Sequence, residues 1–124
     1  MNAIARVAAC TVVIILIGVP VAHGACKRND HGVFEDEGCA ANAYVRADTE
    51  LNATYQRLLS QLDAEAQEKL RRAQRAWIAF RDADAAFVYS MEGDGSAGRM
   101  VAANNGERLT QQRISALRDW RPSK

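Results

Sequence analysis

The stretch from Leu70 to Met91 constrains the fold most, because its apolar residues recur every three or four positions. That spacing is the period of an α-helix, on which residues three and four apart share a face. The same face also carries polar side chains, since Gln74, Trp77 and Arg81 lie in line on it. A polar group buried without a partner costs about 1–3 kcal/mol. This face must therefore meet polar partners inside the fold or bind something outside it.

Two further helical patterns flank this stretch. Between residues 39 and 62, the residues of one face recur every three or four positions, which predicts a helix of about six turns. Asp63 is suited to cap the next helix. A glycine-rich segment at 93–98 predicts an exposed loop, and a third helical pattern follows over residues 100–120, with Pro122 beyond it. No alternating strand pattern is present. We therefore expect an all-α fold, either a small antiparallel helical hairpin or a three-helix bundle.

Residues 1–24 have the features of a secretory signal peptide. The apolar run 7–19 is shorter than the roughly 20 residues of a membrane-spanning helix, and small residues at 22 and 24 predict cleavage before Ala25. An uncleaved N-terminal anchor and a lipoprotein with its lipid on Cys26 are the alternatives. We expect one domain at 25–124, periplasmic or secreted, without stable membrane insertion after cleavage.

This domain keeps two cysteines, Cys26 and Cys39. An even number in an exported chain favours a disulfide, which would tie the polar N-terminal segment to the first helix. Free thiols and a metal pair are the alternatives, and metal is disfavoured because His31 is the only histidine after residue 24. Without Arg6, the 15 acidic residues are balanced by as many basic ones, which argues against nucleic acid and anionic membranes as partners.

The first helical pattern also has a polar face, because Asp48, Asn52 and Tyr55 recur at helical spacing. We expect the two polar faces to meet inside the bundle, with Asp48 or Asn52 paired to Arg81 or Gln74. The alternative is an open polar groove that receives a partner. The predicted structural polar core consists of Asp48, Asn52, Tyr55, Gln74, Trp77, Arg81 and Arg113.

Nothing in the sequence specifies catalysis. The glycines of residues 93–98 match a dinucleotide fingerprint only formally, because a helical pattern and not a strand precedes them. Asp82 and Asp84 are two positions apart and point to different sides of a helix, and no serine has a convincing histidine partner. We expect a protein that is not an enzyme, with no catalytic residue, no metal and no cofactor.

The motifs of this domain resemble the lysozyme inhibitor LprI-like family. The resemblance is densest in the Leu-Asn-x-x-Tyr motif of residues 51–55 and the Gln-x-x-Trp-x-x-x-Arg-Asp motif of residues 74–82, and it spans about 80 residues from Cys39-Ala40 to Leu117. It implies a small exported helical binding protein. Family members commonly carry further cysteines near Ala85 and Asn105, and both are absent here, so the resemblance implies that a second disulfide has been lost.

The function that the resemblance implies is inhibition of a lysozyme by occluding its substrate cleft. A structural or assembly module of the cell envelope is the alternative. Vertebrate lysozymes are strongly basic, so acidic segments of the chain would assist association. The candidate partner contacts are Glu35, Asp36, Glu37, Asp94, Ser96 and Arg99.

Overall fold

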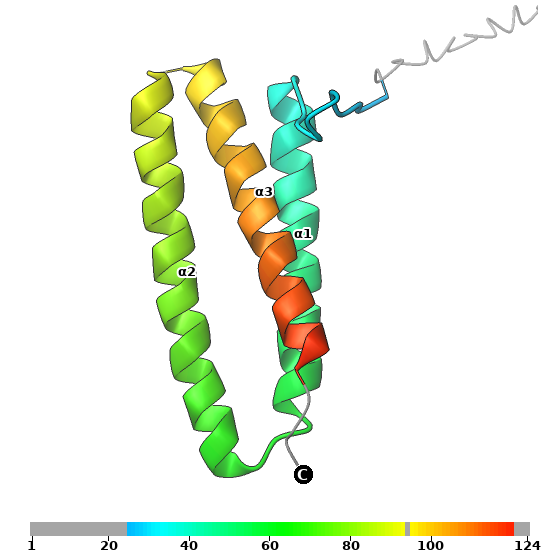
Figure 1. Ribbon diagram of the computed structural model, residues 1–124, viewed down its shortest axis with the longest axis vertical. Coiled ribbons are helices and arrows are strands. Elements are labelled where there is room, and N and C mark those ends of the chain that lie inside the picture. The colour runs from blue at the N-terminus through cyan, green and yellow to red at the C-terminus, as the bar shows by residue number, and fades with distance from the viewer. Residues whose placement is uncertain (1–24, 94, 121–124) are drawn as a thin grey trace, which may run out of the picture.

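The computed structural model describes residues 25–93 and 95–120, so the predicted signal peptide lies outside the described residues. Three helices follow one another: α1 (Glu37–Leu59), α2 (Ala64–Glu92) and α3 (Ser96–Asp119). In the view of Figure 1 they run down, up and down again, each antiparallel to the next. The part of the chain that the structure describes contains no named strand, and the prediction of an all-α three-helix fold is confirmed.

α1 and α2 begin where acidic side chains can cap them, whereas Gly95 precedes α3 without a side-chain cap. Asp36 accepts a hydrogen bond from the backbone N–H of Cys39, and Asp63 accepts one from Ala66, both at 2.8 Å. Each carboxylate thereby satisfies a backbone donor that has no partner within the helix. The predicted cap at Asp63 is confirmed. Gly93, with a φ of +79°, follows the last turn of α2.

The apolar core lies mainly between α1 and α3. Leu51 and Leu58 of α1 pack there with Ile114 and Leu117 of α3. α3 packs against both other helices, more extensively against α1 than against α2 (Figure 1). The residues that α2 buries fully are both polar, Gln74 and Arg81. A second, smaller cluster surrounds Phe34 near the start of α1.

The turn between α2 and α3 is tighter than the sequence predicts. The prediction of an exposed loop over residues 93–98 is wrong in its second half, because α3 already begins at Ser96 and Gly98 is buried within this helix. A Cβ at Gly98 would lie 2.5 Å from the carbonyl oxygen of Gly93 and 3.0 Å from the ring of Tyr89. The glycine therefore allows the end of α2 to approach the first turn of α3, which a loop-like composition does not reveal.

Candidate functional site

The centre of the molecule is a polar seam built around Arg81. Its guanidinium donates to Asp48 Oδ1 of α1 at 2.7 Å and to Asp82 at 3.0 Å, and its side chain is only 9% exposed. The rings of Tyr44 and Trp77 each lie 5.3 Å from the guanidinium carbon. Burial alone would lower the pKa of Arg81, but the hydrogen bonds to the two carboxylates outweigh it and raise that pKa.

A second polar contact joins α2 to α3. Arg113 donates to Gln74 Oε1 at 3.1 Å, and its guanidinium lies 5.9 Å from the Trp77 ring centroid. Burial lowers the pKa of Arg113. Asp84 accepts a hydrogen bond from Asn105 at 2.7 Å, close to the place where the resemblance implies a lost disulfide. These contacts hold α2 in one register relative to α3.

The structure brings together most, but not all, of the residues predicted for the polar core. Asp48 meets Arg81 and Gln74 meets Arg113, with Trp77 beside both cations, while Tyr55 is half-buried against the apolar cluster. Asn52 is exposed and does not take part. The reason is geometric: α1 buries Leu51 toward α3, and Asn52 lies about 100° further around the helix, beyond the edge that Asp48 occupies.

The N-terminal segment is held to α1 by the predicted disulfide and to α3 by residues that the sequence reasoning missed. The expected disulfide joins Cys26 to Cys39, with 5.5 Å between the Cα atoms. Asn104 of α3 accepts from the backbone N–H of Phe34 and donates to its carbonyl, both at 2.9 Å. Arg28 covers the Phe34 ring at 4.1 Å and forms a salt bridge with the buried Glu107 at 3.0 Å. The signal available in the sequence was the helical spacing of the polar residues Asn104 and Glu107 on α3.

The predicted partner contacts lie at one end of the bundle. The start of α1, the end of α2 and the start of α3 meet there (Figure 1). Glu37 of α1 and Arg99 of α3 form a salt bridge at 2.5 Å, which joins the two segments. Glu35 and Ser96 are exposed, and Asp36 is exposed while capping α1. Asp94 lies outside the described residues. We call this end, with Glu35, Asp36, Glu37, Ser96 and Arg99, the acidic end.

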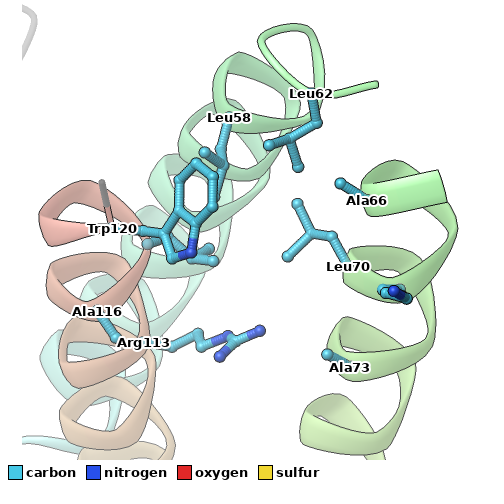
Figure 2. Close-up of a pocket in the computed structure, with 10 residues that line it drawn as sticks. Leu58, Leu62, Ala66, Leu70, Ala73, Arg113, Ala116 and Trp120 are labelled. Atoms are coloured by element: carbon cyan, nitrogen blue, oxygen red, sulfur yellow. The ribbon is translucent and has the colours of Figure 1, made fainter. Parts of the chain in front are cut away.

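An apolar groove of about 410 Å³ occupies the opposite end, between all three helices. Figure 2 shows Leu62 and Leu70 on one side of it and Trp120 on the other, with Arg113 extending from α3 toward α2. Among the residues that the structure describes, no carboxylate forms a salt bridge with Arg113. The groove is large enough for a small ligand.

Within residues 25–93 and 95–120, no group of three or more His, Cys, Asp or Glu side chains is placed to hold a metal ion. Over the same residues, no helix is long and apolar enough to cross a membrane. The charged groups of the seam are engaged with one another, whereas the two ends of the bundle and one face of α2 present exposed side chains.

The geometry defines a small three-helix protein with a polar seam and a disulfide-tied N-terminal segment. Its sequence matches the family "Lysozyme inhibitor LprI" over residues 26–117, and the chain belongs to that family. An uncharacterised protein of Rhizobium meliloti (strain 1021) is 31% identical over 94 residues, covering 65% of this chain and 68% of the relative. No solved structure matches the chain significantly.

Proposed function

We propose that this chain is an exported inhibitor of a lysozyme. The acidic end would cover the substrate cleft of the lysozyme and exclude substrate, and the inhibitor itself would catalyse no reaction. Membership of the lysozyme inhibitor family supports a binding role. The observation that favours this end is the convergence of two segments distant in sequence, joined by the salt bridge between Glu37 and Arg99. Export would follow cleavage before Ala25, and the disulfide between Cys26 and Cys39 fits an oxidising compartment.

The acidic end is held rigidly, which favours binding. The disulfide, the cap of Asp36 and the two hydrogen bonds of Asn104 to Phe34 fix its backbone before a partner arrives. The conformational entropy lost on association is then smaller. Exposed carboxylates at this end would also attract a basic partner and speed its encounter.

The test is hydrolysis of cell walls by a c-type lysozyme in the presence of the protein expressed with its own leader. We expect inhibition, weakened by about three- to tenfold when Glu35→Gln and Asp36→Asn are combined, because attraction falls while asparagine still caps α1. A matched control combines Glu65→Gln and Glu68→Gln, which removes two carboxylates from the exposed first turns of α2.

The control variant should inhibit as well as the parent. Absence of inhibition at a large molar excess of the parent would refute the proposal. If the protein then still captured a cell-envelope protein through the acidic end, the assembly module would become the better hypothesis.

A further inference from the structure

The outer face of α2 carries an apolar stripe that nothing in the described part of the chain covers. Phe80, Phe87 and Met91 are 54%, 61% and 69% exposed, which is unusual for side chains of this size on one helix face. Exposed alanines continue the stripe at helical spacing. The α2 stripe consists of Ala76, Phe80, Ala83, Phe87 and Met91.

We propose that the α2 stripe is the contact between two copies of this chain, packed antiparallel about a twofold axis between residues 81 and 82. The order of large and small residues supports this alignment. With that axis, Phe80 lies opposite Ala83 of the second copy and Phe87 lies opposite Ala76, so each ring meets a small residue. Parallel packing in register would instead set phenylalanine against phenylalanine and alanine against alanine.

The distribution of charge supports the same direction. The first half of α2, residues 64–78, has four basic and two acidic residues, whereas residues 79–92 have three acidic residues and only Arg81 as a base. Antiparallel packing places the basic half of one copy over the acidic half of the other. The last turn of α2 contains no basic residue, and Lys69 and Arg72 of the second copy would lie beside its negative end.

Sedimentation of the exported protein over a range of concentrations tests the association. We expect a monomer–dimer equilibrium whose dissociation constant rises at least about tenfold in Phe87→Ser, because an aromatic anchor is lost. Val45→Ser is the matched control, since Val45 is 63% exposed on α1 and is not part of the α2 stripe. A parent that remains monomeric at every accessible concentration overturns the proposal, and so does an equal effect of both substitutions.

Crosslinking of single cysteines tests the direction. Position 83 lies next to the proposed twofold axis. In a Cys10→Ser background, two copies of the Ala83→Cys variant should therefore crosslink to each other at this position through a short bis-maleimide. Ala76→Cys should crosslink to Phe87→Cys in a mixture, but not to itself, because antiparallel packing separates the two copies of residue 76 by about three helical turns. Self-crosslinking of Ala76→Cys as readily as Ala83→Cys would overturn the antiparallel arrangement. This inference does not depend on lysozyme inhibition.

Discussion

The two interfaces of α3 differ in chemistry. Against α1 it buries aliphatic side chains such as Ile114. The residues that α2 buries most, Gln74 and Arg81, form hydrogen bonds to α3 and α1, and its apolar contribution to the core comes from the half-buried Leu70 and Trp77. Apolar burial contributes most of the stability of a small domain and is not directional. Buried polar pairs contribute little net free energy but tolerate only one alignment. The α1–α3 interface therefore provides stability, and the α2 interface provides register.

The largest expected effect is on the α1–α3 interface. Ile114 is 1% exposed, and Ile114→Ala should lower the free energy of unfolding by about 2–5 kcal/mol, because the lost burial and the cavity add together. Urea denaturation followed by circular dichroism measures it. Val45→Ala, at an exposed position of α1, should change stability by less than about 0.5 kcal/mol. Equal losses in the two variants would contradict this assignment of the core.

A smaller loss is expected at the seam. Arg81→Ala should cost about 1–3 kcal/mol, because Asp48 loses its partner but is 43% exposed and can bind water instead. A double-mutant cycle with Asp48→Ala should give a coupling of about 0.5–1.5 kcal/mol. If Arg81→Ala and Trp77→Ala left thermal stability unchanged and abolished partner binding, the seam would be an open groove and not an internal lock.

A still smaller loss is expected at the contact between α2 and α3. Gln74→Ala removes the side chain to which Arg113 donates and should cost about 1 kcal/mol in urea denaturation. Gln111→Ala, at an exposed position of α3, is the control and should be neutral. A Gln74→Ala variant as stable as this control would show that the contact does not hold α2 in place.

The smallest effect is expected at alkaline pH. Burial, opposed by Arg81 and reinforced by Asp82 and Asp48, raises the pKa of Tyr44 above its ordinary value of 10.0. The unfolded chain then releases the phenol proton at a lower pH than the folded chain, so stability declines as pH rises through about 10. Tyr44→Phe should reduce this decline, as followed by thermal unfolding from pH 8 to pH 11. If thermal stability declined with pH as steeply in Tyr44→Phe as in the parent, Tyr44 would not be the group responsible for the decline.

The elements could be predicted from sequence because local signals define them. Helical spacing gave three helices, Asp63 marked the start of one, and the pair Cys26 and Cys39 indicated the disulfide, all of which the structure contains. The pairing of Asp48 with Arg81 followed from matching two polar faces. These are properties of one helix face or of a short segment.

What escaped prediction depends on the arrangement of the helices. That α3 packs on both neighbours cannot be inferred from periodicity, because each helix has an apolar face. Asn52 lies one position beyond the buried face and is exposed, although its spacing resembles that of Asp48. The hydrogen bonds of Asn104 to the Phe34 backbone join residues 70 positions apart, so the polar spacing on α3 could mark Asn104 but not its partner.

The helix on which both others pack is the third of the three described helices in chain order. Until residues 96–119 are available, α1 lacks the partner of Leu51 and Leu58, and the segment around Phe34 lacks Asn104 and Glu107. An incomplete chain therefore cannot bury its core. The three helices therefore fold as one cooperative unit, which forms only once residues 96–119 are present.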